Sequence, residues 1–316
     1  MKKNGTSQPI GIFDSGIGGL TVFKEIHKEV PNEGIVYFGD TAHVPYGTKS
    51  KETITKFSVD NVLFLQSFGV KMVVVACNTA SSLSLETLQR KFSIPIVGVI
   101  EPGARAALAR TKNGRIGVIG TKSTIGSNAY ETWLKKLDPS AKVYSNACPL
   151  FVPFVEEGWL DGDIVSKVAH TYLDAFKSFK IDTLILGCTH YPLLSSVIQK
   201  TVGPKVRLVN SAEETAKEAK RLLAKLKLGH TVRSKSPDLR FYVSDEPEQF
   251  RVLGERFLGR TIASVAKVAE HYRQPAFDRR LSAPAKERGG SASGGNGRTS
   301  YGAQVLEGPF ISKAKA

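Results

Sequence analysis

The chain contains little cysteine and no long apolar run. Only three of its 316 residues are cysteine, and no two of them form a C-x-x-C pair. No window approaches the 18 consecutive apolar residues that indicate a transmembrane helix. The basic start of the chain is not followed by the apolar segment of a secretory signal. These absences argue against a disulfide framework and a membrane protein, and they predict a protein of the reducing cytoplasm.

Motifs of common cofactor and metal sites are also missing. The turn DSGIGGLTV (14–22) follows an apolar run, as phosphate loops do, but it is neither G-x-G-x-x-G nor G-x-x-x-x-G-K-[ST]. A plain tight turn or a site for a small anion, such as a carboxylate, remains open there. Beyond the C-x-H of Cys188 and His190, no cysteine–histidine cluster has zinc-ligand spacing, so no metal is predicted.

The chain is basic, and part of that charge lies at one end. The formal net charge is +15, and residues 273–316 hold eight Lys or Arg against three acids, a net of +5. The remaining charge of about +10 could attract polyanions or small anionic substrates. No helix-turn-helix, zinc finger or aromatic-basic pattern accompanies it, so nucleic acid is not an expected partner. Because 273–316 is rich in Gly, Ser, Arg and Ala without periodicity, we predict a disordered tail there.

Before the tail, apolar runs rich in valine and isoleucine alternate with helical periodicity. Nearly continuous apolar strands are typical of parallel sheets that helices cover on both faces. We therefore predict an α/β fold, and nine strands favour two similar domains over one sheet. The expected strands are 9–13, 34–39, 71–77, 94–100, 115–120, 142–148, 183–188, 205–210 and 239–244, and clear helical patterns cover 18–30, 51–69, 162–179 and 211–229.

Polar side chains follow several of these strands at their carboxyl ends, where ligands gather in parallel α/β sheets. VVVACNTASSL (73–83) and LILGCTHYPLL (184–194) share one layout, with Cys77 or Cys188 between an apolar run and a helical pattern. The second of these helices is expected to begin at Pro192. A helix N-terminus favours the thiolate and can lower the pKa of a thiol below its usual value of about 8.5.

Two cysteines, one from each half of the chain, suit proton transfer on both faces of one carbon. A racemase removes a proton from one face and returns one to the other, which requires one thiolate and one thiol. Asp14 and His190 are available to assist the two thiols. A Cys–His hydrolase would leave the second cysteine unexplained. Cys148 is expected to be an inert buried thiol.

Five motifs occur in one order: GIFDSGIGGLTV, YFGDTAHVPYG, VVACNTASS, GVIEPG and LGCTHYPLL. Together they resemble bacterial glutamate racemase, of the aspartate/glutamate racemase superfamily, over about 9–272. The resemblance implies two similar α/β domains that face each other across a cleft containing the active site. Residues 1–99 with 211–272 would form the first domain and 100–210 the second.

The resemblance also implies an activity and its residues. The reaction would be the cofactor-independent interconversion of L- and D-glutamate, which supplies D-glutamate for peptidoglycan synthesis, in a cytoplasmic homodimer. Cys77 would be the base for D-glutamate, supported by Asp14, and Cys188 the base for L-glutamate, supported by His190 and Glu156. Asp40 would be a further catalytic acid. The substrate contacts would be Asp14, Ser15, Tyr46, Gly47, Asn78, Thr79, Thr121, Thr189 and His190.

Other functions remain open on chemical grounds. An aspartate racemase or a related racemase of the superfamily would use the same two thiols, whereas a decarboxylase would keep only one of them. No lysine marks a strand end as a Schiff-base site, so no pyridoxal cofactor is expected. The basic charge, and the gyrase inhibition known in some members of the family, leave a DNA- or gyrase-binding protein as the remote alternative.

Overall fold

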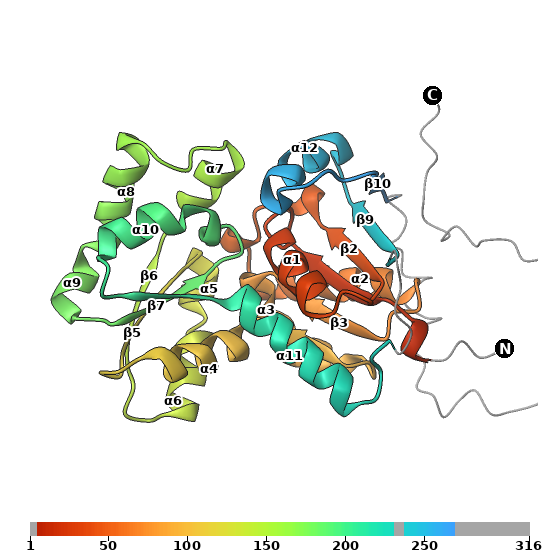
Figure 1. Ribbon diagram of the computed structural model, residues 1–316, viewed down its shortest axis with the longest axis horizontal. Coiled ribbons are helices and arrows are strands. Elements are labelled where there is room, and N and C mark those ends of the chain that lie inside the picture. Colours follow the sequence, from red (N-terminus) through yellow and green to blue (C-terminus); the bar gives the residue numbers. More distant parts are fainter. Residues whose placement is uncertain (1–4, 231–236, 269–316) are drawn as a thin grey trace, which may run out of the picture.

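The computed structural model describes residues 5–230 and 237–268 and contains two sheets, each flanked by helices (Figure 1). The six-stranded sheet has the order β10-β9-β2-β1-β3-β4, and the four-stranded sheet has the order β6-β5-β7-β8. Every strand pair in these described ranges is parallel. The predicted α/β class with parallel sheets is confirmed.

Each of the nine predicted apolar runs forms a strand. A tenth strand of two residues was not predicted, because two residues carry no periodicity. The strands are β1 (Ile10–Asp14), β2 (Ile35–Gly39), β3 (Met72–Val75), β4 (Ile96–Gly98), β5 (Arg115–Gly120), β6 (Lys142–Ala147), β7 (Thr183–Gly187), β8 (Arg207–Asn210), β9 (Leu239–Val243) and β10 (Ala266–Lys267).

The helices follow the predicted patterns with two differences. The pattern over 162–179 forms two helices, and the α-helix expected at Pro192 begins only at Ser195, after a 3-10 turn over Tyr191–Leu194. The α-helices are α1 (Leu20–Glu29), α2 (Lys51–Gln66), α3 (Asn78–Lys91), α4 (Ile100–Arg110), α5 (Lys122–Gly126), α6 (Ala129–Leu137), α7 (Phe151–Glu156), α8 (Asp163–Leu173), α9 (Ala175–Phe179), α10 (Ser195–Val202), α11 (Ser211–Lys225) and α12 (Pro247–Leu258).

The chain visits the two sheets in three stages. Strands β1–β4 belong to the six-stranded sheet, β5–β8 form the four-stranded sheet, and β9 and β10 return to the first. Helix α11, on the return path, packs against α1 and α4 and so touches both parts of the molecule. The domain limits given above, 1–99 with 211–272 and 100–210, stay a prediction. The predicted tail, 273–316, lies outside the described residues.

Burial on both faces holds the central strands in place. On β1, Ile10 and Ile12 enter an apolar cluster that extends into the four-stranded sheet, while Phe13 enters a second cluster on the opposite face. The central strands therefore lack a solvated face, which explains their nearly continuous apolar sequences. Within the described ranges, no helix has the length and apolarity needed to cross a membrane.

A buried ion pair stabilises the first sheet away from the strand ends that carry the cysteines. The Lys71 Nζ lies 2.5 Å from the Glu33 Oε2, and both side chains are at most 4% exposed. The same ammonium donates to the carbonyls of Thr6 and Leu228, and the Glu33 Oε1 accepts from the backbone N–H of His230. Four segments that are distant in the sequence thus come together at this ion pair.

Removing the ammonium should destabilise the fold strongly. In Lys71→Met the Glu33 carboxylate stays buried without its cation, so we expect the free energy of unfolding to fall by about 3–5 kcal/mol. Urea denaturation followed by circular dichroism measures this change. Lys28→Met, which removes an exposed partner of Glu25, is the control and should cost less than about 1 kcal/mol. Equal losses in the two variants would contradict the role of the buried pair.

Candidate active site

A cavity of about 260 Å³ opens where the carboxyl ends of the two sheets face each other. Cys77 follows β3 and Cys188 follows β7, so the two thiols come from different sheets and line the same cavity. This volume is below the range of about 300–1,000 Å³ that is typical of sites for drug-sized ligands, so it suits a small metabolite. The lining residues are Ser15, Val44, Pro45, Tyr46, Gly47, Thr48, Cys77, Asn78, Thr79, Thr121, Lys122, Pro149, Val152, Pro153, Glu156, Cys188, Thr189 and His190.

Cys77 is the N-cap of α3. Its Sγ accepts from the backbone N–H of Ala80 at 3.5 Å and lies 3.8 Å from the Ser15 Oγ. Burial, followed by the nearby carboxylate of Asp14, raises the pKa of Cys77 to about 12. The two hydrogen bonds act in the opposite direction but do not offset burial. A position at a helix N-terminus can lower the pKa of a thiol, and at Cys77 burial outweighs that effect.

Asp14 ends β1 directly behind the cavity. Its carboxylate is fully buried and accepts from the Gly16 N–H at 3.0 Å, while Oδ1 has no partner among the described residues. Burial raises the pKa of Asp14, and the charge of His190 and the N–H groups of the turn oppose this rise. The glycine-rich turn therefore holds the chain's own carboxylate. At Gly19 a Cβ would lie 2.4 Å from the Asp14 Cβ, so the close approach requires glycine there.

Cys188 forms a chain of contacts with His190 and Glu156. The Cys188 Sγ lies 3.8 Å from the His190 Nδ1, and the His190 Nε2 lies 3.1 Å from the Glu156 Oε1. Burial lowers the pKa of His190, but the hydrogen bonds to Cys188 and Glu156 outweigh it and raise that pKa to about 10. The raised pKa favours the protonated imidazole, which would place positive charge beside Cys188.

An amide and two hydroxyls, from Asn78, Thr79 and Thr121, also line the cavity. The Asn78 Oδ1 accepts from the Tyr130 hydroxyl at 2.7 Å, while its buried Nδ2 has no partner in the described part of the chain. The Thr79 Oγ1 lies 2.9 Å from the Thr121 Oγ1, a contact between residues that follow strands of different sheets. Buried donors are almost always paired, so the free amide of Asn78 indicates a place for a ligand oxygen.

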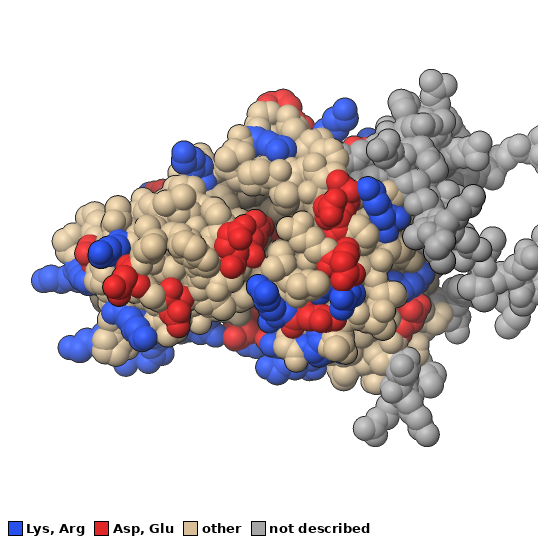
Figure 2. Space-filling model, turned by 90° about the horizontal axis from the view of Figure 1, so that it is seen from above, with Lys and Arg blue, Asp and Glu red and all other residues tan. Residues whose placement is uncertain are grey.

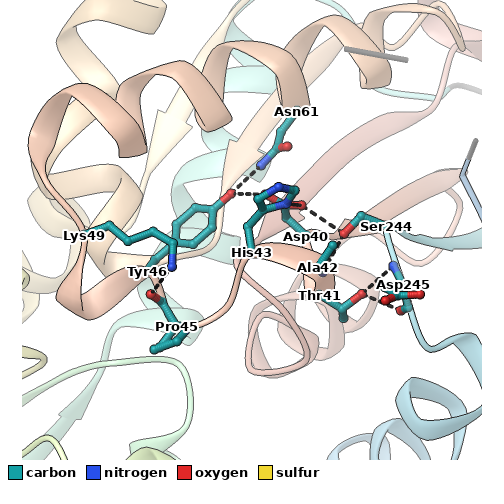
Figure 3. Close-up of polar contacts among 10 residues, drawn as sticks. All are labelled: Asp40, Thr41, Ala42, His43, Pro45, Tyr46, Lys49, Asn61, Ser244 and Asp245. Atoms are coloured by element: carbon teal, nitrogen blue, oxygen red, sulfur yellow. Dashed lines mark hydrogen bonds and ion pairs between the residues drawn. The ribbon is translucent and has the colours of Figure 1, made fainter. Parts of the chain in front are cut away.

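Asp40, at the end of β2, is fully buried and does not line the cavity. Its oxygens contact the His43 Nδ1 at 2.8 Å, the Tyr46 hydroxyl at 2.5 Å and the Ser244 hydroxyl at 2.9 Å (Figure 3). The Asn61 Nδ2 donates to the same Tyr46 hydroxyl at 3.1 Å. Asp40 thus joins the segment after β2 to the segment after β9, and Tyr46 is its link to the cavity.

The structure brings most of the expected site residues to one cavity. The cavity lining includes Cys77, Cys188, Glu156 and His190, together with seven of the expected substrate contacts: Ser15, Tyr46, Gly47, Asn78, Thr79, Thr121 and Thr189. Asp14 and Asp40 are fully buried and lie behind the cavity wall. Lys122 also lines the cavity, although nothing in the sequence marked it as special. The apolar residues Pro149, Val152 and Pro153 were missed, because only polar residues were sought at the strand ends. They follow β6 at the same sheet edge.

Two further expectations can be compared with the structure. Cys148 is fully buried and lies outside the cavity lining. Within the described ranges, no three His, Cys, Asp or Glu side chains gather so that they could hold a metal ion.

Seen from above, the described surface carries acidic and basic side chains interspersed (Figure 2). The basic charge is therefore not gathered over this face.

Comparison with known proteins gives consistent matches. The family model for Asp/Glu/Hydantoin racemase matches residues 10–219. The glutamate racemase of Geobacter metallireducens is 53% identical over 263 residues, which are 82% of this chain and 96% of that protein.

Two solved structures are similar over nearly their whole length. Glutamate racemase isoform RacE1 from Bacillus anthracis has a TM-score of 0.80 at 45% identity and covers 84% of this chain and 98% of its own. Glutamate racemase from Francisella tularensis, solved in complex with D-glutamate, has a TM-score of 0.79 at 43% identity with the same coverage. With the family model matching about two thirds of its length, the chain belongs to the Asp/Glu/Hydantoin racemase family.

Proposed function

We propose that the chain interconverts L- and D-glutamate by proton transfer between two cysteines, without a cofactor. The observation that carries the proposal is that Cys77 and Cys188, held at the ends of strands in different sheets, line one cavity. The relatives named glutamate racemase support glutamate as the substrate, and one of their structures contains D-glutamate.

The reaction needs one thiolate and one thiol on opposite sides of the substrate carbon. The thiolate removes the α-proton, and the electron pair of the broken C–H bond remains on the substrate, where the adjacent carboxyl group spreads the charge. The other thiol then gives its proton to the opposite face and becomes the thiolate. We assign Cys188 as the base for L-glutamate and Cys77 as the base for D-glutamate.

The charges around the two thiols differ in sign. The imidazole of His190, held by Glu156, places positive charge beside Cys188, while the carboxylate of Asp14 raises the pKa of Cys77 and so favours its thiol. The positive charge therefore lies on the side of the proposed base for L-glutamate, and the negative charge lies on the side of the proposed acid. This is the arrangement required to convert L-glutamate to D-glutamate.

Several lining groups can bind the two carboxylates of glutamate. Asn78 offers a buried amide without a partner, and Lys122 and His190 bring positive charge to the wall. We assign Ser15, Tyr46, Gly47, Asn78, Thr79, Thr121 and Thr189 as substrate contacts. Asp40 contributes indirectly, because its carboxylate holds the Tyr46 hydroxyl and does not reach the cavity.

We extend the proposal to the role in the cell on the basis of the family resemblance. The product D-glutamate would enter peptidoglycan synthesis, and the enzyme would act in the cytoplasm as a homodimer. Nucleic acid has no part in this proposal.

The first prediction of the proposed function concerns activity. The purified chain should racemise glutamate, measured by loss of optical rotation from either enantiomer, and Cys77→Ala and Cys188→Ala should each lose activity by at least about 10³-fold, because each removes one of the two proton-transfer groups. Cys148→Ala, the control, should retain the activity of the unaltered chain. Turnover of aspartate with none of glutamate would overturn the assigned substrate, and an active Cys188→Ala protein would overturn the two-base scheme.

The second prediction separates the roles of the two thiols. A variant with one cysteine can still exchange the α-proton of the enantiomer that this cysteine faces. In deuterated water, Cys77→Ala should therefore exchange the α-proton of L-glutamate but not of D-glutamate, and Cys188→Ala should show the reverse preference. Proton NMR of each enantiomer follows the exchange. Equal exchange of both enantiomers by one variant would contradict the assignment.

The third prediction concerns the pKa of Cys77. Because the Asp14 carboxylate raises this pKa, Asp14→Asn should lower it by about one pH unit or more. The pH midpoint of iodoacetamide alkylation, measured in a Cys188→Ala background, reports the change. Asp40→Asn also removes a buried carboxylate at a strand end and is the matched control, with an unchanged midpoint expected. A midpoint that rises in Asp14→Asn would refute the electrostatic assignment.

A further inference from the structure

His190 is enclosed by groups from both parts of the molecule. Residues of the part around the four-stranded sheet, Cys188 and Glu156, each contact one of its ring nitrogens. Gly18, before α1, and Phe257, on α12, reach it from elements of the six-stranded sheet. As a result His190 is only 5% exposed.

Phe257 contacts the imidazole as an aromatic neighbour. The two ring centroids are 5.8 Å apart and the ring planes are at 89°, an edge-to-face arrangement that is favourable between aromatic rings. Phe257 is itself 6% exposed. Helix α12 also lies close to the C-terminal end of α7, which carries Glu156 (Figure 1). A Cβ atom built on Gly158, two residues after Glu156, would lie 3.1 Å from the Arg256 Nη1.

Gly18 lies against Thr189 and His190, the two residues that follow Cys188. A Cβ at this position would lie 2.5 Å from the His190 Nδ1 and 2.3 Å from the Thr189 Oγ1, distances that real Cβ atoms essentially never show. The Thr21 hydroxyl, one turn further on, donates to the Thr189 carbonyl at 3.1 Å. Glycine at position 18 therefore allows the start of α1 to lie directly against the imidazole.

We propose that Phe257 and Gly18 are positioning residues, which hold the His190 ring between Cys188 and Glu156 from across the cleft. The inference rests on the proposed function. The Cys188–His190 contact of 3.8 Å is longer than the 3.1 Å contact between His190 and Glu156, so the packing of Gly18 and Phe257 adds to what holds the ring near Cys188. A misplacement of about 1 Å at a reacting group can cost about 10²-fold in rate, so the packing around the ring bears directly on proton transfer.

The motifs that indicate the family do not include Phe257. The family model ends at residue 219, and α12 covers 247–258. The last helix of the described chain thus contributes to the site without any motif of its own. The proposed role of α12 follows from the contact and from no sequence pattern.

Phe257→Leu tests this role, because leucine keeps an apolar side chain but removes the aromatic ring. We expect kcat to fall by about tenfold with KM changed by less than about twofold. Primary isotope effects then locate the step that has slowed. With α-deuterated L-glutamate, whose deuterium goes to Cys188, the isotope effect on kcat/KM should rise. With α-deuterated D-glutamate, whose deuterium goes to Cys77, it should fall towards one.

The isotope effects also separate positioning from a general loss of folded protein. Phe250→Leu makes the same change on the same helix, at a buried ring that packs on Tyr37 and not on His190. It should leave both isotope effects unchanged even if less active protein is obtained, because an isotope effect does not depend on enzyme concentration. Phe257→Leu with isotope effects equal to those of the unaltered chain would overturn the inference. If the unaltered chain did not racemise glutamate at all, the proposed function would fail instead.

Discussion

The opposed arrangement of two parallel sheet edges is the constraint on which the site depends. A carbon can exchange its proton from both faces only if an acid and a base approach it from opposite sides. Parallel sheets direct the ends of their strands to one edge, so one sheet presents Cys77 and the other presents Cys188. The contact between the Thr79 and Thr121 hydroxyls fixes these two edges at short range. The fold therefore supplies the geometry, and the two thiols supply the proton-transfer groups.

Electrostatics then makes the two thiols unequal. Burial raises the pKa of the Cys77 thiol, because it penalises the charged form. Asp14 adds to this rise at Cys77, whereas Cys188 has the imidazole of His190 beside it at 3.8 Å, and the pKa of that imidazole is raised to about 10. The two supporting groups also interact with each other, since the charge of His190 lowers the pKa of Asp14 against the effect of burial. The charge on one side of the cavity therefore shifts the pKa of a group on the other side, which suits a site that alternates between two protonation states.

Much of this structure could be predicted from the sequence, because buried strands and their polar ends leave local patterns. The nine apolar runs located the strands, and the two Cys-bearing ends located the cavity. The directions of side chains were less accessible. Asp14 ends β1 and Asp40 follows β2, at the same sheet edge as Cys77. Their carboxylates nevertheless turn to the Gly16 N–H and to His43 and Ser244, away from the cavity lining. The pKa of Cys77 could not be predicted from the sequence for a related reason, since burial depends on residues that are distant in the sequence.

The return of the chain to the first sheet has a consequence for both walls of the cavity. After β9, Ser244 hydrogen-bonds Asp40 and thereby supports the loop that carries Tyr46. Near the end of α12, the helix that follows β9, Phe257 packs on His190. Neither contact has a local sequence pattern, and both come from the segment that follows the excursion through the second sheet. The segment of β9 and α12 therefore does more than complete a sheet, because it contacts both the wall at Tyr46, through Asp40, and the wall at His190.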